Sequence, residues 1–201
     1  MTKPYTKQYR AYRRWYPILK ILMWLFAHTR FIGRENIPEG ACVVCGNHTS
    51  NVDPFFLLDM LPISDHLRIL TKVELYRIPV VGAFLRSVGM IRVDRSIADI
   101  TPVRESMAHL KIGGKVAIFP QGTRVTEDES VAAKTGAVRI ADKTRAPILP
   151  VYIPRRKRIF RRNTVVIGVP YEVNPAHVRL TPEDTERLSA ELMGRIAELA
   201  P

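Results

Sequence analysis

The sequence is short of cysteine, of acidic residues and of long hydrophobic runs. Only two of its 201 residues are cysteines, so the chain has no disulfide scaffold. Cys42 and Cys45 stand three positions apart in an apolar run, where an extended backbone points them to opposite faces of a sheet. A redox Cys-x-x-Cys pair belongs in a turn that leads into a helix, and a metal site needs further ligands. We therefore expect two buried core thiols and no metal site.

Acidic residues are outnumbered by basic ones. The 19 Asp and Glu residues stand against 31 Lys and Arg residues, which gives a formal net charge of +12. This excess predicts a polyanionic partner, which can be a nucleic acid, an anionic membrane or an acidic carrier protein. The length and the 46% hydrophobic content predict one core of ordinary size rather than two full domains.

The first 34 residues form a basic and aromatic arm, followed by a domain at residues 35–201. No acid appears before Glu35, and the apolar run at residues 21–27 is much shorter than the ~20 residues of a spanning helix. A helix with cations on one side and Trp, Leu and Phe on the other suits the headgroup boundary of an anionic membrane. The alternative is an amphipathic helix packed on its own domain. A signal peptide is not favoured, because no small-residue cleavage site follows.

Beyond the arm, short β-branched runs alternate with longer helical patterns. This alternation predicts an α/β domain with a twisted, largely parallel sheet flanked by helices. The expected strands are residues 42–45, 68–71, 90–93, 115–119, 148–153 and 165–169. The expected helices are residues 54–60, 73–87, 101–111 and 131–143. A last helix follows Thr181, which can cap it, and its apolar stripe of Leu188, Leu192 and Ile196 predicts packing on the domain.

His48 and Asp53 are the candidate catalytic pair. They follow directly after an expected strand, where open α/β sheets place their ligand sites. On a helix the two side chains would diverge by about 140°, so they converge only in a loop, and the intervening residues are typical of one. Asp53 can then fix one imidazole tautomer and leave the other nitrogen to take a proton from a substrate hydroxyl. The alternative is that Asp53, before Pro54, caps the next helix and binds backbone amides instead of His48.

Three later segments add candidate binding residues. Residues 119–124, Phe-Pro-Gln-Gly-Thr-Arg, place a Gly-containing turn and the Arg124 guanidinium after a strand, where they can hold a phosphate. Residues 89–95 form a strand with Arg92 and Arg95 toward its end, and residues 146–151 form a stiff apolar strand that can line an acyl pocket. Each has a structural alternative: a surface ion pair for Arg95, a solvated Arg124, and a core strand at residues 146–151.

Together and in this order, the four segments resemble the glycerolipid acyltransferase family typified by 1-acyl-glycerol-3-phosphate acyltransferase. The resemblance runs from residue 47 to about residue 153, with Lys72, Pro79 and residues 134–136 in family-like positions. It implies that His48 deprotonates the acceptor hydroxyl while Asp53 orients His48. The hydroxyl then attacks an acyl thioester directly, which agrees with the absence of a Gly-x-Ser-x-Gly elbow around any serine.

The resemblance also implies substrate-binding roles. Arg95 occupies the place of the arginine that the family uses for the acceptor phosphate. The other expected substrate-binding residues are Lys72 and four residues of the third block, Gln121, Gly122, Thr123 and Arg124. Gln121 stands where the family has a glutamate, and Val125 where it has a serine. A glutamine keeps an acceptor oxygen but loses the charge, so the exact acceptor is left open.

We therefore expect an O-acyltransferase that uses a thioester of acyl carrier protein or of coenzyme A as co-substrate and needs no resident cofactor. The acceptor is a lysophospholipid, foremost 1-acyl-glycerol-3-phosphate, and the product is then phosphatidic acid. The arm and the resemblance together imply a peripheral or monotopic enzyme on the cytoplasmic face of the cell membrane.

The basic stretch at residues 155–162 leaves alternatives open. Its cations can form a solvated face, touch lipid phosphates or bind the acidic carrier of an acyl chain. Competing functions are acylation of another lyso-lipid, a lipid-binding protein with a decayed site, and a nucleic-acid-binding module. No nucleic acid is expected, because Phe160 is the single aromatic residue among these cations and leaves few rings for base stacking.

Overall fold

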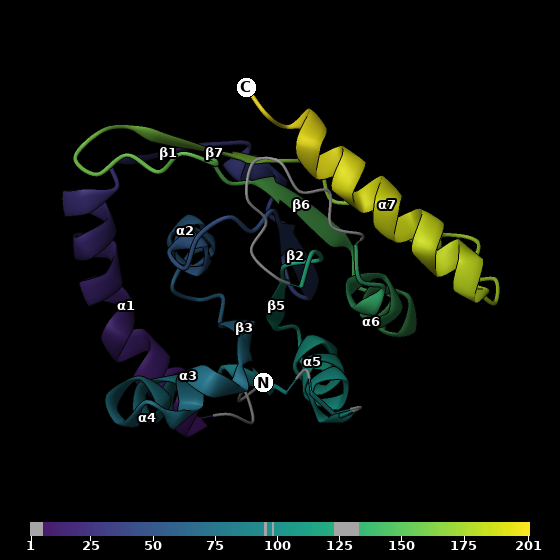
Figure 1. Cartoon of the computed structure of the whole chain (residues 1–201), viewed down its shortest axis with the longest axis horizontal. Helices are drawn as coiled ribbons and strands as arrows, with labels where there is room; N and C mark the ends of the chain where they lie inside the picture. The colour runs from purple at the N-terminus through teal and green to yellow at the C-terminus, as the bar shows by residue number, and fades with distance from the viewer. Residues whose placement is uncertain (1–5, 95, 98, 123–132) are drawn as a thin grey trace.

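The computed structural model describes residues 6–94, 96–97, 99–122 and 133–201. Across these residues, seven strands form one sheet in the order β1-β7-β6-β2-β5-β3-β4 (Figure 1). The strands are β1 (Thr29–Ile32), β2 (Cys42–Gly46), β3 (Leu67–Lys72), β4 (Ile91–Val93), β5 (Lys115–Ile118), β6 (Ile148–Tyr152) and β7 (Asn163–Ile167). Every neighbouring pair runs parallel except β6 and β7. The predicted α/β domain with a largely parallel sheet is confirmed.

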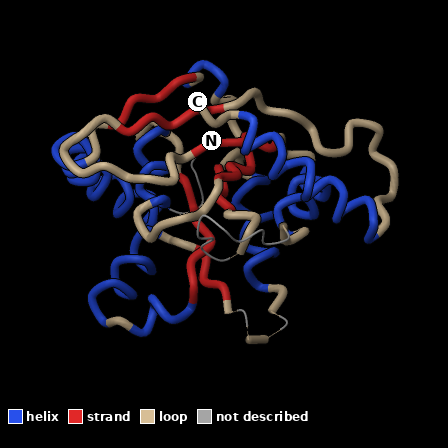
Figure 2. Tube along the Cα trace, turned by 45° about the horizontal axis from the view of Figure 1, so that its top comes forward, coloured by secondary structure: helices blue, strands red, loops and turns tan. Residues whose placement is uncertain are grey.

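Helices cover both faces of this sheet. They are α1 (Thr6–Phe26), α2 (Asp53–Met60), α3 (Val73–Arg77), α4 (Pro79–Val88), α5 (Thr101–Lys111), α6 (Gly136–Thr144) and α7 (Pro182–Glu198), with a 3-10 turn η1 (Arg34–Asn36). Helices α1 to α4 lie on one side of the strands and α5 to α7 on the other, which gives three layers (Figures 1 and 2). The sheet is therefore buried on both faces, as its apolar strands require.

Strand β2 lies at the centre and carries both cysteines. Cys42 and Val44 face the core under α1, α2 and α4, whereas Val43 and Cys45 face the core under α5, α6 and α7. Burial raises the pKa of the Cys42 thiol to about 12 and also raises the pKa of Cys45. The prediction of two buried core thiols on opposite faces is confirmed.

We expect both thiols to be unreactive in the native protein. The thiolate is the reactive species, and burial disfavours it at both positions. Iodoacetamide in mildly alkaline solution should leave both cysteines unmodified in the native state, and both should react after unfolding in guanidinium. Mass spectrometry counts the adducts. A native chain that carries one or two adducts would contradict the burial of β2.

Two of the predicted helices differ from the structure by more than one residue. The pattern at residues 73–87 predicts one helix, but α3 ends at Arg77 and α4 begins at Pro79. A residue before proline is disfavoured in the helical region, and Ile78 is extended, with φ −75° and ψ 117°. The helix predicted over residues 131–143 begins at Gly136, while residues 131 and 132 lie outside the described residues.

The N-terminal arm is not helical throughout. Helix α1 ends at Phe26. Strand β1, which the sequence did not predict, then joins the sheet at its edge by pairing with β7. One face of α1 packs on the domain through Tyr12 and Met23, as in the packed-helix alternative. Another face leaves apolar side chains in solvent, with Trp24 70% exposed. None of the helices in the described part of the chain combines the length and hydropathy needed to cross a membrane.

Helix α7 begins as the sequence predicts. The Thr181 hydroxyl accepts a hydrogen bond from the Asp184 backbone amide at 3.1 Å, and the Asp184 carboxylate accepts from the Thr181 amide at 3.1 Å. This is a capping box with Pro182 in the first turn. Leu192 and Ile196 are buried against the sheet and Leu188 packs beside them, so the predicted packing role is confirmed.

Candidate active site

The predicted site residues come from the carboxyl ends of neighbouring parallel strands. Strands β2, β5 and β3 lie side by side and run in the same direction, so their carboxyl ends share one edge of the sheet. His48 follows β2, Gln121 follows β5, and Lys72 is the last residue of β3. Ligand sites of open parallel sheets lie at this edge.

The loop after β2 is held by two neighbouring strand ends. The Asn47 side chain donates to the Ile153 carbonyl at 2.8 Å and accepts from the Ile153 amide at 2.7 Å, just beyond β6. On the other side, Gln121 Oε1 accepts a hydrogen bond from the His48 backbone amide at 2.8 Å. These bonds fix the backbone of His48 from both sides. Gln121, which stands where the resembling family has a glutamate, thus contacts the backbone of the loop that carries His48.

His48 and Asp53 converge in this loop. His48 Nδ1 lies 3.0 Å from Asp53 Oδ2, and the imidazole stacks on the Phe119 ring with centroids 4.2 Å apart. The same carboxylate oxygen accepts from the Thr49 and Ser50 amides, each at 2.7 Å. The two sequence interpretations therefore combine. Asp53 binds backbone amides, but these belong to the loop before α2, and the carboxylate binds His48 as well.

Lys157 is the third member of this group, and the sequence did not single it out. Its Nζ lies 2.6 Å from Asp53 Oδ1 and also donates to Thr49 Oγ1. Arg155, Arg156 and Arg158 beside it are exposed, so Lys157 alone of residues 155–158 turns inward. The available signal was the position of this basic stretch directly after β6, the strand that neighbours β2.

Asp53 is held as an anion by its surroundings. Its side chain has no exposed surface, and burial on its own raises the pKa of the carboxyl. Hydrogen bonds with His48 and Lys157, the positive charge of Lys157 and the Ser50 amide outweigh burial and hold the pKa of Asp53 below its usual range. The carboxylate therefore stays ionised around neutral pH.

This arrangement leaves one imidazole nitrogen for chemistry. With Nδ1 on Asp53, the free His48 nitrogen is Nε2, which has no hydrogen-bond partner among the residues that the structure describes. The His48 side chain is 14% exposed, so a ligand can reach it. A histidine oriented by a buried carboxylate can take a proton from a hydroxyl group.

The remaining predicted binding residues are placed only in part. Gly122 adopts a left-handed backbone with φ 68°, a conformation that residues with a Cβ rarely adopt, so the turn after β5 favours glycine. Lys72 is half-buried at its strand end. Arg95, Thr123 and Arg124 lie outside the described residues. The strand at residues 148–152 is part of the core, with Ile148, Leu149 and Val151 fully buried.

A three-layer α/β fold that holds a histidine against a buried carboxylate at its strand ends defines the class of proteins that can take a proton from a substrate hydroxyl. The acyltransferase family model matches residues 28–154, more than half of the chain, and the chain belongs to this family.

Relatives from other organisms are similar to this chain over most of its length. The 1-acyl-sn-glycerol-3-phosphate acyltransferase of Bacillus subtilis is 32% identical over 192 residues, which cover 90% of this chain and 92% of the relative. The Pseudomonas aeruginosa protein of the same name is 31% identical, with 84% of this chain and 69% of the relative covered. The crystal structure of the 1-acyl-sn-glycerophosphate (LPA) acyltransferase PlsC from Thermotoga maritima matches with a TM-score of 0.69 and 25% identity, covering 95% of this chain and 79% of that one.

Proposed function

We propose that this acyltransferase esterifies 1-acyl-sn-glycerol-3-phosphate to phosphatidic acid, with His48 as general base. His48 Nε2 takes the proton of the acceptor hydroxyl as its oxygen attacks the thioester carbonyl carbon. The carbon–sulfur bond then breaks, and the imidazolium returns the proton to the departing thiolate. Asp53 holds the tautomer and stabilises the imidazolium. The transfer uses no resident cofactor, because the thioester already carries the activated acyl group.

The convergence of His48 and Asp53 at the strand edge is the observation that carries this proposal. A loop in which one buried carboxylate oxygen binds both the imidazole and two backbone amides leaves little freedom to either side chain. Such preorganisation costs nothing at the moment of reaction. The intact geometry favours a working enzyme over a decayed lipid-binding site, and the names of the relatives support the acceptor.

Gln121 bears on how the acceptor is bound. Because its Oε1 accepts from the His48 amide, the side-chain NH₂ is the group that remains for a ligand. An NH₂ donates to acceptor oxygens, including those of a phosphate or an ester. We propose that Gln121 and Gly122 line the acceptor side of the site, together with Thr123 and Arg124. Lys72, at the end of β3, and Arg95 supply positive charge for the phosphate.

We also propose that the enzyme works at an anionic membrane surface on the cytoplasmic side, where its lipid acceptor resides. Ile21, Trp24 and Leu25 at the end of α1 are exposed, as are Ile159 and Phe160 in the loop before β7. Exposed cations lie earlier on α1, at Arg13 and Arg14, and in the loop itself, at Arg158 and residues 161–162. Apolar side chains flanked by Lys and Arg are typical of segments that enter the headgroup boundary.

A lyso-lipid panel tests the acceptor and the donor. Purified protein is incubated with lyso-lipids that differ only in headgroup, each with an acyl carrier protein thioester and with a coenzyme A thioester, and mass spectrometry identifies the product. We expect phosphatidic acid from 1-acyl-glycerol-3-phosphate to form fastest. Faster acylation of a headgroup without a terminal phosphate would assign another acceptor. Failure of both donors with every acceptor would contradict the activity.

A further inference from the structure

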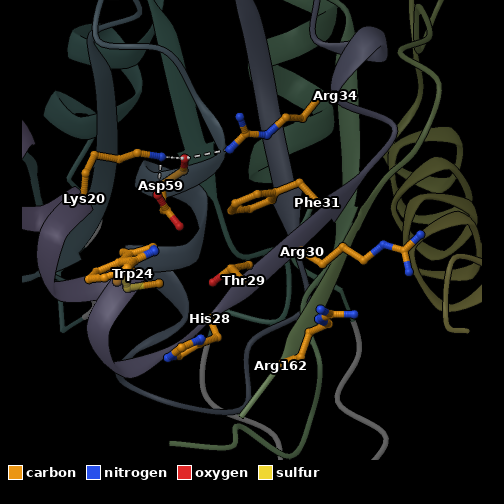
Figure 3. A pocket seen from close by; sticks show the side chains of 10 residues that line it. Lys20, Trp24, His28, Thr29, Arg30, Phe31, Arg34, Asp59 and Arg162 are labelled. Atoms are coloured by element: carbon orange, nitrogen blue, oxygen red, sulfur yellow. Dashed lines mark hydrogen bonds and ion pairs between the residues drawn. The ribbon is translucent and has the colours of Figure 1, made fainter. Parts of the chain in front are cut away.

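A cavity of about 700 Å³ opens between the end of α1, strand β1 and the end of α2. Its volume lies within the ~300–1,000 Å³ of small-molecule sites. Four cations and a single carboxylate line it, Lys20, Arg30, Arg34, Arg162 and Asp59 (Figure 3). Arg162 comes from the loop before β7, so segments far apart in the sequence bring their positive charges together here.

Most of this charge is not neutralised within the protein. Lys20 forms an ion pair with Asp59, and both Lys20 and the Arg34 guanidinium donate to the Asp59 carbonyl, at 2.8 and 3.4 Å. Among the residues that the structure describes, Arg30, Arg34 and Arg162 form no ion pair with a carboxylate. Three guanidinium groups around one cavity favour an anion, and their planar donors suit phosphate oxygens.

The wall also carries a hydroxyl that lacks a partner. Thr29 Oγ1 is buried, yet within the described part of the chain it has no hydrogen bond. Thr29 lies between His28 and Arg30 on the cavity wall (Figure 3). This oxygen has almost no accessible surface, so the charges of the surrounding arginines, and not the hydroxyl, are what a ligand in the cavity meets.

Exposed aromatic side chains lie on the cavity wall and on the chain beside it. Trp24 lines the cavity and is 70% exposed. Phe26, two residues further on, contacts Phe160, two residues before Arg162, with ring centroids 5.5 Å apart, and both residues are exposed. Aromatic side chains gather at the level of lipid headgroups. A free phosphate would gain nothing from these rings, whereas a bilayer lipid with its phosphate in the cavity would have its acyl chains beside them.

We infer that this cavity binds the phosphate headgroup of an anionic phospholipid in the bilayer and thereby docks the α1 and β1 corner on the membrane. The site is distinct from the catalytic pair. Asp53 and Asp59 are six residues apart on α2, so the helix separates them by ~9 Å along its axis. The inference rests on the proposed membrane association and assigns it to a defined pocket.

Vesicle binding with matched charge variants tests the pocket. The pocket variant combines Arg30→Gln with Arg162→Gln. The control combines Arg139→Gln with Lys143→Gln on the exposed side of α6, far from α1 in Figure 1, and removes the same charge. Sedimentation with phosphatidylcholine vesicles containing phosphatidylglycerol measures affinity. Since a cation near an anionic leaflet contributes about fivefold, we expect the pocket variant to bind about 25-fold more weakly, and the control to change less than about twofold.

Two further arms separate the headgroup from general charge and from the acceptor. Arg30→Lys combined with Arg162→Lys keeps the charge but removes the planar guanidinium donors, and we expect about fivefold weaker vesicle binding than the wild type with unchanged thermal stability. Transfer to a monodisperse short-chain acceptor should keep its KM in the pocket variant. Equal vesicle binding by the pocket and control variants would overturn the inference alone. A raised KM for the short-chain acceptor in the pocket variant would show that the cavity binds the acceptor instead. Absence of vesicle binding by the wild-type protein would contradict both the membrane association and the headgroup site.

Discussion

His48→Ala should lower kcat by roughly a hundredfold to ten-thousandfold while the protein stays folded. The imidazole is the group with a free nitrogen beside a buried carboxylate, so the variant loses the base and keeps the scaffold. The His48 backbone amide still donates to Gln121. Because the side chain is not part of the central core, we expect little change in the melting temperature. Steady-state transfer to 1-acyl-glycerol-3-phosphate measures the loss.

A control in the same loop makes this result specific. Ser50 contributes its backbone amide to Asp53, and its hydroxyl contacts only the nearby Val52 amide at 3.4 Å among the described residues. Ser50→Ala should therefore keep transfer within about twofold, because the amide is retained. Full transfer activity in His48→Ala would exclude a histidine base. A loss confined to KM would make His48 a binding residue.

The sequence predicted what depends on local chemistry. His48 and Asp53 could be paired because loop residues lie between them and a strand precedes them, and both properties can be read from adjacent positions. What the sequence left open was the use of the Asp53 oxygens. A carboxylate has several acceptor positions, and Oδ2 serves His48 and two amides at once. The sequence interpretations had Asp53 bind either His48 or backbone amides, whereas in the structure it binds both.

Contacts between distant segments account for most of what was missed. Lys157 meets Thr49 across 108 positions, and a lysine within a run of arginines carries no local sign of which cation turns inward. Strand β1 is four residues long and lies within a basic, aromatic segment. It is too short for hydrophobic alternation to predict a strand there, and its pairing with β7 was therefore not predicted. Pro79 is a local signal against one helix across Ile78, because a residue before proline is disfavoured in the helical region.

Asp53→Asn should lower kcat about as much as removal of the His48 imidazole does. The corresponding exchange in a serine-protease triad lowers kcat about 10⁴-fold. Here the amide oxygen can still accept from Thr49, Ser50 and His48 Nδ1 while the NH₂ faces Lys157, so the tautomer is kept. What is lost is the negative charge that stabilises the imidazolium and balances Lys157. We expect near-complete loss of transfer with a folded protein. A variant that keeps the wild-type kcat would show that Asp53 only stabilises the loop and does not take part in catalysis.

Lys157→Met should lower kcat less, by about tenfold to hundredfold. The imidazole keeps its contact with the Asp53 carboxylate, but that carboxylate is held less firmly in place. Removing Lys157 takes away a hydrogen bond and a charge that lower the pKa of Asp53, so that pKa rises. In the wild type, stability from ionised Asp53 is present above its unfolded pKa of ~3.9 and disappears as pH falls through the lower folded pKa. In Lys157→Met this loss of stability should therefore move to higher pH, which the melting temperature measured against pH will show. Arg156→Met, an exposed neighbour, should leave it unchanged.

The two substitutions should not be additive. Once Asp53→Asn has removed the carboxylate, Lys157 has no ion-pair partner among the described residues, and its replacement by Met has little left to disrupt. We therefore expect the double variant to transfer acyl groups about as slowly as Asp53→Asn alone and to be at least as stable. A double-mutant cycle on kcat/KM and on the melting temperature measures this coupling. Losses that simply add would show that Lys157 contributes through a separate contact, such as one with the thioester donor.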